Sequence, residues 1–422
     1  MEYQLWGLDP LGYHIDNVLL HAINPIVLWR ILVFLGVPAA WLVSAAFALH
    51  PVHVESVAWI TERKNLLSGF FYLLSLYTFL RFYFPGQSVF SSENPVKNRS
   101  AVLYGVSLFF FIFALFGKSI TCTLPATVLL LFWWKQNRIH LKIIQLMVPF
   151  FAVGFGFATL TIWLEKFNAG AFGPEWDFSF WDRFLIAGQA LWFYIGKLIW
   201  PFPIIFTYPR WNIDDSVWWQ YLYPATFLLL ILILWALRNK IGRGPLTAIL
   251  FFSGSLFPAL GFFNIYPMRF SFVADHFQDL ASIGILLVIV GGITRLTKKG
   301  ALASSILLLL FLGYLTWEQV PVYKNVFTLW SDTVQKNPNA WMAHYNLGNL
   351  FIAEQKTEEA IAQYREAIRI KPDFVDVYNN WGIALLKEGK NKEAITRFRK
   401  ALELKPGYAD AQNNLKIARR AA

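Results

Sequence analysis

Long apolar runs separated by short polar segments occupy the first three quarters of the chain. Runs of about twenty apolar residues recur between residues 17 and 320, and a helix of that length crosses a hydrocarbon core of roughly 30 Å. The expected spans are 17–37, 39–49, 66–84, 101–116, 120–134, 143–164, 219–237, 245–263, 280–293 and 302–320. The pattern predicts an all-α fold, a polytopic membrane helix bundle of about ten crossings.

Basic residues in the loops between these spans indicate the orientation. The positive-inside rule places the loops at 97–99 and 135–142 in the cytoplasm. The loop at 238–243 is also cytoplasmic only if 184–200, which is rich in Trp and Tyr, makes no net crossing. We therefore expect a re-entrant or interfacial helix there, and both termini on the extracytoplasmic side.

The pattern changes after residue 320, where charges become frequent and apolar residues fall at helical spacing. Six packing positions recur 34 residues later, the tetratricopeptide period: Leu347, Gly348, Ala360, Tyr364, Ala367 and Pro372 return as Trp381, Gly382, Ala394, Phe398, Ala401 and Pro406. We predict a membrane domain at 1–320 and an extracytoplasmic tetratricopeptide domain at 321–422. Its expected parts are a partial repeat at 325–338, repeats at 341–374 and 375–408, and a capping helix at 409–420.

Asparagines recur at one position of this repeat, as Asn346, Asn380 and Asn414. A ladder of side-chain amides can bind the backbone of an extended peptide without reading its sequence. Asn can equally be a residue that the position merely tolerates. The repeats therefore predict a polypeptide partner, and the three asparagines are its candidate ligands.

Composition agrees with the membrane assignment and narrows the partners. Hydrophobic residues make up 56% of the chain and charged residues only 15%. The net charge of +11 follows from the basic cytoplasmic loops, so it is no evidence for a nucleic-acid partner. The lipid bilayer is the expected surrounding.

The segment HPVHVESVAWITERKN, residues 50–65, concentrates polar residues between two apolar spans. His50, His53 and Glu55 are of the types that bind a divalent cation, and a carboxylate is also a usual general base. Their spacing matches no zinc-binding pattern. A helix cap at the membrane interface explains the same residues equally well.

Basic residues on the same outer face are candidates for binding a phosphate. Arg63 and Lys64 end the segment above, Lys118 stands alone in GKSIT, and Arg269 and His276 lie in YPMRFSFVADHFQD. Arg and Lys suit phosphate recognition, although a charged helix start or a snorkelling side chain is the ordinary alternative.

Several motifs in order, HPVHVESVAWITERKN, GKSITCTLP, YPMRFSFVADHFQDLASIG and the repeats, resemble the TMTC family of transmembrane and tetratricopeptide-repeat-containing proteins and its bacterial relatives. The resemblance implies a GT-C type glycosyltransferase that moves a sugar, typically mannose, from a polyprenyl-phosphate donor to Ser or Thr of a protein. It implies Glu55 and His53 as catalytic groups, and His50 with Glu55 as ligands of a divalent metal such as Mg or Mn. The expected donor-phosphate ligands are Arg63, Lys64, Lys118, Arg269 and His276.

The chain departs from the family pattern at its start. A first span and an acidic outer loop precede the GYHIDNVLLH-like helix in that pattern, whereas Met1 lies just ahead of it here. We therefore expect an N-terminally truncated chain whose principal acidic groups lie upstream, and a bacterial inner membrane rather than the endoplasmic reticulum. The alternative function is a non-catalytic membrane-anchored scaffold whose repeats bind periplasmic or lumenal proteins.

Overall fold

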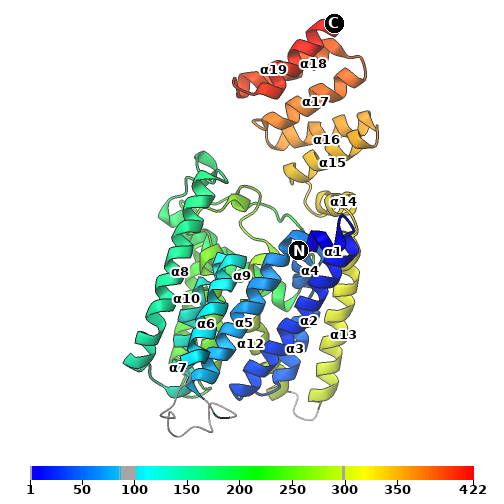
Figure 1. Cartoon of the computed structure of the whole chain (residues 1–422). Coiled ribbons are helices and arrows are strands. Elements are labelled where there is room, and N and C mark those ends of the chain that lie inside the picture. The colour runs from blue at the N-terminus through cyan, green and yellow to red at the C-terminus, as the bar shows by residue number, and fades with distance from the viewer. Residues whose placement is uncertain (1, 85, 87–100, 297–299) are drawn as a thin grey trace. The chain divides into compact units, whose positions relative to one another are not determined.

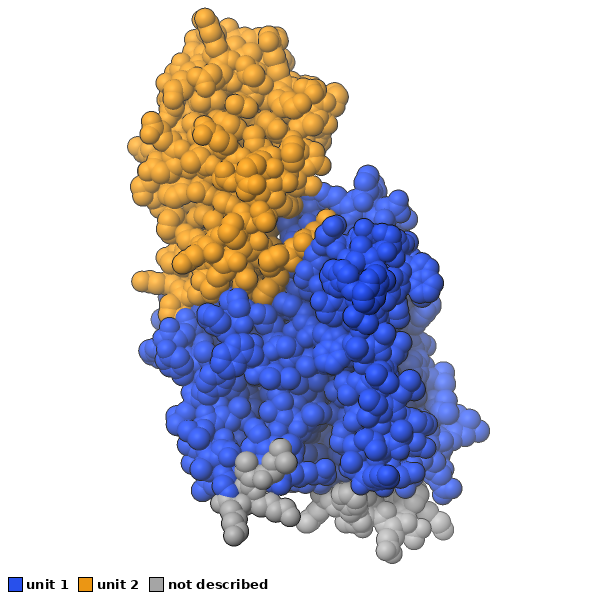
Figure 2. Space-filling view, turned by 180° about the vertical axis from the view of Figure 1, so that it is seen from behind, with its two compact units in different colours: residues 1–204, 211–320 blue, residues 205–210, 321–422 orange. Residues whose placement is uncertain are grey.

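The computed structural model describes residues 2–84, 86, 101–296 and 300–422. All regular secondary structure in these residues is helical. The chain divides into two compact units (Figure 2), one formed by residues 1–204 and 211–320 and the other by residues 205–210 and 321–422.

The first unit is a bundle of helices that run side by side (Figure 1). Its helices in chain order are α1 Glu2–Trp6, α2 Pro10–Phe34, α3 Ala40–Leu49, α4 Val54–Ala58, α5 Arg63–Tyr83, α6 Ala101–Gly117, α7 Leu124–Gln136, α8 Leu141–Phe167, α9 Phe180–Ile199, α10 Leu222–Leu237, α11 Gly244–Leu256, α12 Ser282–Leu296 and α13 Ala301–Gln319.

Five of the described helices are long and apolar enough to cross a membrane: α2, α5, α8, α10 and α13, the second and fourth with the turn before them. The helices α3, α6, α11 and α12 are apolar but shorter. Large apolar side chains face outward, such as Phe155 at 73% exposure and Leu307 at 67%, and an apolar surface of this kind requires lipid. The predicted all-α membrane bundle is confirmed, while the number of crossings and their orientation stay predictions.

Capping residues explain where two helices begin. The Asp9 carboxylate accepts a hydrogen bond from the Leu11 N–H, and Pro10 occupies the first helical position of α2. Ser179 and Asp182 form a capping box at the start of α9. The expected interfacial segment 184–200 lies almost entirely within α9, which packs on α10 and α12. Whether α9 makes a net crossing stays a prediction.

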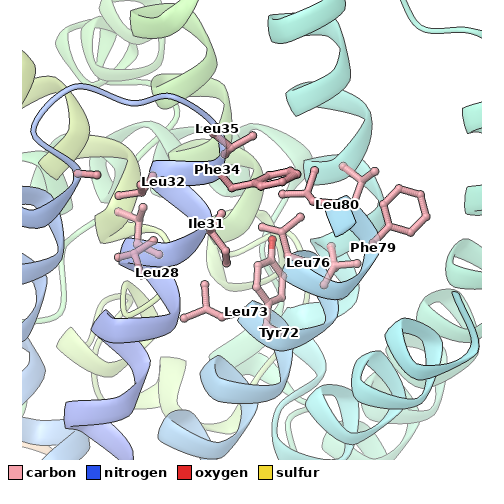
Figure 3. Close-up of a cluster of buried hydrophobic side chains, with 14 of the residues drawn as sticks. Leu28, Ile31, Leu32, Phe34, Leu35, Tyr72, Leu73, Leu76, Phe79 and Leu80 are labelled. Carbon is pink, nitrogen blue, oxygen red and sulfur yellow. The ribbon is translucent and has the colours of Figure 1, made fainter. Parts of the chain in front are cut away.

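The core of the bundle is apolar, with facing side chains on α2 and α5 (Figure 3). Among the polar contacts inside the bundle, a pair of serines joins α5 to α6. The Ser75 hydroxyl donates to the Ser107 carbonyl at 2.7 Å, and the Ser107 hydroxyl donates back to the Ser75 carbonyl at 2.8 Å. Small residues allow this close approach and satisfy each other's polar groups inside the bundle.

The second unit consists of paired helices. Their bounds are α14 Val326–Lys336, α15 Trp341–Ala353, α16 Thr357–Ile370, α17 Val375–Lys387, α18 Asn391–Leu404 and α19 Ala409–Ala421. Helices α15 to α18 fall in the two predicted repeats, and α19 follows them. Residues 205–210, which the sequence did not assign to this unit, join it because Asn337 donates to the Thr207 carbonyl at 2.9 Å and Phe206 packs on Trp330.

Glycine at two positions lets the helices of each repeat pack closely. A Cβ at Gly348 would lie 2.4 Å from the Tyr364 ring, and one at Gly382 would lie 2.5 Å from the Phe398 ring. Both rings are almost fully buried. The glycine and aromatic positions of the 34-residue pattern are therefore direct packing partners.

We expect Gly382→Ala to destabilise the second unit by about 1–3 kcal/mol, because the added methyl group overlaps a buried ring that has no room to move. Amide hydrogen exchange of the full chain should show faster exchange in α17 and α18. Gly407→Ala is the matched control, since nothing lies within 4 Å of its Cβ position. Equal exchange in the two variants would contradict the packing argument.

Candidate functional site

Three segments that are distant in the sequence meet at one end of the bundle. They are residues 53–65, the Lys118 segment before α7, and residues 275–282 before α12. The polar side chains that meet there form what we call the polar cluster: His53, Glu55, Asn65, Lys118, His276 and Asp279. Most of them are buried, which is unusual for charged side chains and marks the cluster as a candidate site.

Glu55 and His276 form the first carboxylate–imidazole pair. Glu55 Oε1 lies 2.9 Å from His276 Nδ1, and the His276 backbone N–H donates to Glu55 Oε2 at 3.3 Å. Burial raises the pKa of Glu55 to about 8, while burial and then the Lys118 ammonium lower the pKa of His276 to about 3. At neutral pH the Glu55 carboxyl therefore holds the proton and donates it to a neutral ring nitrogen.

His53 and Asp279 form the second pair. His53 Nδ1 lies 2.7 Å from Asp279 Oδ1, and His53 Nε2 lies 3.4 Å from the Ser282 hydroxyl. Burial alone would raise the pKa of Asp279, but the hydrogen bond and charge of His53 hold that pKa below its ordinary value. The two buried carboxyl groups of the cluster thus differ in protonation, the pattern that separates an acid from a base.

Lys118 carries the positive charge of the cluster. Its Nζ donates to Asn65 Oδ1 at 2.5 Å and to the His276 carbonyl at 3.3 Å, and it lies 3.9 Å from Glu62 Oε2. Burial lowers the pKa of Lys118 to about 8. Lys64 pairs with the other Glu62 oxygen at 2.9 Å and is half exposed. Both lysines can therefore meet an anion that arrives at this end of the bundle.

A small polar cavity lies against the cluster. Its volume is about 10 Å³, enough for one water molecule, and Asn65, Ser68, Ser255, His276 and Asp279 supply its polar lining. The cavity can hold a water molecule beside Asp279.

The geometry does not fit the predicted metal site. His50 Nε2 lies 3.1 Å from the Leu198 carbonyl, and His50 Nδ1 accepts the Val52 N–H, so both ring nitrogens have partners in the chain. Glu55 is turned to His276 instead. No group of three or more His, Cys, Asp or Glu side chains within the described residues is placed to hold a metal ion. These residues fit a buried helix cap better than a metal site.

Two predicted phosphate ligands have other partners. Arg63 donates to Asn17 Oδ1 and to the Tyr13 carbonyl, each at 2.7 Å, and so ties α5 to α2. Arg269 lies 3.3 Å from Glu175 and donates to the Tyr266 hydroxyl at 2.9 Å. These contacts give both guanidinium groups structural roles.

The repeat asparagines are half buried and hydrogen-bonded within the repeats. Asn380 Nδ2 donates to the Tyr345 hydroxyl and to Asn349 Oδ1, and Asn414 Nδ2 donates to Asn379 Oδ1. Asn346 Nδ2 donates to the Met342 carbonyl in its own helix. The amides at Asn380 and Asn414 link α17 to α15 and α19 to α17, and these contacts favour a structural role over peptide binding.

Sequence reasoning did not select Asp279 or Asn65 as site residues. Asp279 stands three residues after His276, in the segment that supplied two candidates, so its place in that segment was the available signal. Asn65 ends the HPVHVESVAWITERKN segment. Its amide joins all three parts of the cluster, since it donates to Ser56 and His276 and accepts from Lys118.

Comparison with known proteins gives matches for both parts of the chain. The TPR repeat family model matches residues 348–389 and 382–415. Human protein O-mannosyl-transferase TMTC1 is 24% identical over 89% of this chain and 47% of its own length. The Caenorhabditis elegans protein O-mannosyl-transferase F38B6.6 is 26% identical over 89% of this chain and 53% of its own length.

The chain thus spans about half the length of the curated relatives it matches. Mouse protein O-mannosyl-transferase TMTC3 is similar over a comparable extent, at 20% identity over 90% of the chain and 44% of the relative. These alignments run through the helix bundle as well as the repeats. The bundle, the repeats and the ordered motifs thus agree with the alignments, and over about 89% of its length the chain is similar to protein O-mannosyl-transferases of the TMTC family of transmembrane and tetratricopeptide-repeat-containing proteins.

Proposed function

We propose that the polar cluster transfers a sugar, mannose, from a polyprenyl-phosphate donor to a Ser or Thr hydroxyl of a polypeptide. The observation that carries this proposal is the meeting of two buried carboxylate–imidazole pairs and the Lys118 ammonium at one end of a membrane bundle. The names of the relatives, protein O-mannosyl-transferases, support the choice of mannose and of a protein acceptor.

Asp279 is the base in this proposal. Ionised and oriented by His53, it accepts the proton of the acceptor hydroxyl as the hydroxyl oxygen bonds to the anomeric carbon. The bond from that carbon to the phosphate oxygen breaks, the configuration inverts, and the electron pair leaves with the phosphate. This assignment changes the role of Glu55, which the sequence suggested as the base.

The leaving phosphate gains negative charge, and fixed cations stabilise it. The Lys118 ammonium is held by Asn65 in a poorly solvated place, where an ionic interaction is strong. Glu55 holds its proton at neutral pH in the hydrogen bond to His276, so it adds no negative charge beside the phosphate. Lys64 adds a second, more exposed cation. The proposed reaction does not use Arg63, Arg269 or a metal ion.

The remaining parts of the proposal concern the partners. The repeats would present the acceptor polypeptide, as the match to the TPR repeat model supports. The polar cluster would face the extracytoplasmic side of a bacterial inner membrane or of the endoplasmic reticulum, in line with the basic loops at the other helix ends.

A transfer assay tests the proposal. The full chain in lipid nanodiscs, given polyprenyl-phosphate mannose labelled in the sugar and a Ser/Thr peptide pool, should label the peptides. Lys118→Met should lower the rate about 100-fold, because one fixed donor to the developing phosphate charge is lost. Lys142→Met is the matched control, since Lys142 is exposed and lies at the start of α8 beside the loop at the opposite helix ends. Equal rates for the two variants would remove Lys118 from the mechanism. Peptide binding without any transfer would favour the scaffold function.

A further inference from the structure

A large apolar cavity lies inside the bundle and extends away from the end that holds the polar cluster. Its volume is about 590 Å³, within the range of pockets that hold small-molecule ligands. Side chains of α2, α3, α5, α7, α11 and α12 line it, among them Leu32, Leu76, Phe251 and Leu287. Figure 3 shows part of this lining, where Leu28 and Ile31 of α2 approach Leu73 and Leu76 of α5.

The direction of the helices shows where this cavity lies relative to the polar cluster. Helices α2 and α12 both start beside the polar cluster, since Asn17 donates to the Val57 carbonyl and Ser282 contacts His53. The cavity reaches Leu35 and Arg295, near the far ends of the same two helices. Along α12 it extends from Ile283 to Arg295, about 18 Å at 1.5 Å per residue. That length is close to one leaflet of a hydrocarbon core of roughly 30 Å.

The end of the cavity at Arg295 is cationic. Arg295 lines it and is exposed. Lys135 lies 3.7 Å from the ring centre of the lining Trp134, and Arg243 precedes the lining Gly244 and donates to the Trp133 carbonyl. No Asp or Glu occurs in the sequence of the lining segments 28–43, 72–76, 127–134, 244–251 and 283–295. The charge at this end therefore complements an anionic headgroup.

Glycine keeps the cavity open on the α12 side. Gly291 and Gly292 both line it, and nothing lies within 4 Å of the Cβ position of either. Three polar lining side chains have partners inside the bundle, since Tyr72 donates to Thr127 at 2.7 Å and Thr294 donates to the Val290 carbonyl, while the buried Thr247 hydroxyl has no hydrogen-bond partner among the described residues. The interior thus suits a hydrocarbon chain, and only the rim suits charge.

We propose that this cavity binds one acyl chain of an anionic glycerophospholipid from the adjacent leaflet, with the phosphate at Arg295, Lys135 and Arg243. The site is separate from the proposed transfer reaction, whose polyprenyl phosphate would have its charged group at the opposite end of the bundle. A resident lipid would fill a space that six helices share and so hold them together.

Native mass spectrometry of the purified full chain tests this site. Palmitoyl-oleoyl phosphatidylglycerol should remain bound at one molecule per chain, and phosphatidylcholine with the same chains should bind at least about tenfold more weakly. The double variant Gly291→Leu with Gly292→Leu should lose the bound lipid, because the new side chains fill the cavity. Gly313→Leu, on α13 and away from the lining, also has free space at its Cβ position and should keep it.

The variant Arg295→Gln tests the headgroup contact separately, because the substitution does not fill the cavity. It should reduce the preference for phosphatidylglycerol over phosphatidylcholine several-fold while chain binding continues. Full lipid retention in the double glycine variant, or no headgroup preference in the parent chain, would overturn the proposal. Displacement of phosphatidylglycerol by polyprenyl phosphate, blocked in the double variant, would assign the cavity to that lipid instead.

Discussion

Asp279→Asn should lower the rate of mannose transfer about 1000-fold or more. The amide has the size of the carboxylate and its oxygen can still accept the hydrogen bond from His53, so the local packing is kept. It cannot accept the proton of the acceptor hydroxyl, and loss of a positioned general base costs between about 100-fold and 10,000-fold. Asp279 is expected to have the largest effect because it is the ionised carboxylate of the cluster beside the small polar cavity.

Kinetics of the full chain in nanodiscs provide the measurement. The loss should appear in kcat, with the KM for the donor little changed, since Asp279 meets the acceptor and not the phosphate. Asp373→Asn is the matched control, a carboxylate in the repeats that is 68% exposed. Asp279→Glu should restore part of the rate, because the carboxylate returns at a shifted position. A fall in thermal stability with kcat unchanged would make Asp279 a structural residue only.

The sequence predicts those parts of the fold that depend on interactions within one helix or one helix pair. Hydropathy over a whole helix predicts the spans, because each helix satisfies its own backbone hydrogen bonds in lipid. The repeats could also be predicted from the sequence, because Gly348 and Tyr364 pack against each other within one helix pair and recur at a fixed period. Such contacts need no knowledge of the rest of the chain.

The site followed only in part. Glu55, His53, Lys118 and His276 were singled out by residue type and position, and they do meet. Their partners were not foreseeable, because the contacts join residues 221 and 226 positions apart. A single sequence contains no signal for which helices of a bundle become neighbours.

Two of the predicted phosphate ligands have partners within the chain that the sequence does not indicate. Arg63 and Arg269 lie on the expected segments, but their acidic and carbonyl partners come from other segments: Asp16 and Tyr13 of α2 for the first and Glu175 for the second. A buried or half-buried guanidinium is held by such partners, and those partners decide whether it can meet a ligand. His50 likewise has partners within the chain for both of its ring nitrogens.

Glu55→Gln should make the protein more stable, and the gain should grow between pH 6 and pH 8. Burial raises the pKa of Glu55 from 4.5 to about 8, so the folded chain keeps a proton that the unfolded chain loses. The contribution of Glu55 to stability is therefore complete below pH 4.5 and is lost as the pH rises through 8. A difference of one unit between the pKa values of the folded and unfolded chain corresponds to about 1.4 kcal/mol. The free energy of unfolding should therefore be lower by about 3–5 kcal/mol near pH 8 than below pH 4.5.

Glutamine avoids this loss because it has no proton to release. Its NH₂ group can donate to the neutral His276 ring nitrogen and its oxygen can accept the His276 backbone N–H, so both hydrogen bonds of the pair can persist. Thermal unfolding followed by tryptophan fluorescence, in one detergent at pH 6, 7 and 8, should show the parent midpoint falling with pH and the variant midpoint falling less. Glu403→Gln, at a carboxylate that is 67% exposed, should follow the parent. A variant whose advantage is constant across this range would show that Glu55 is already ionised at pH 6, and Asp279 would then no longer be distinguished from it as the base.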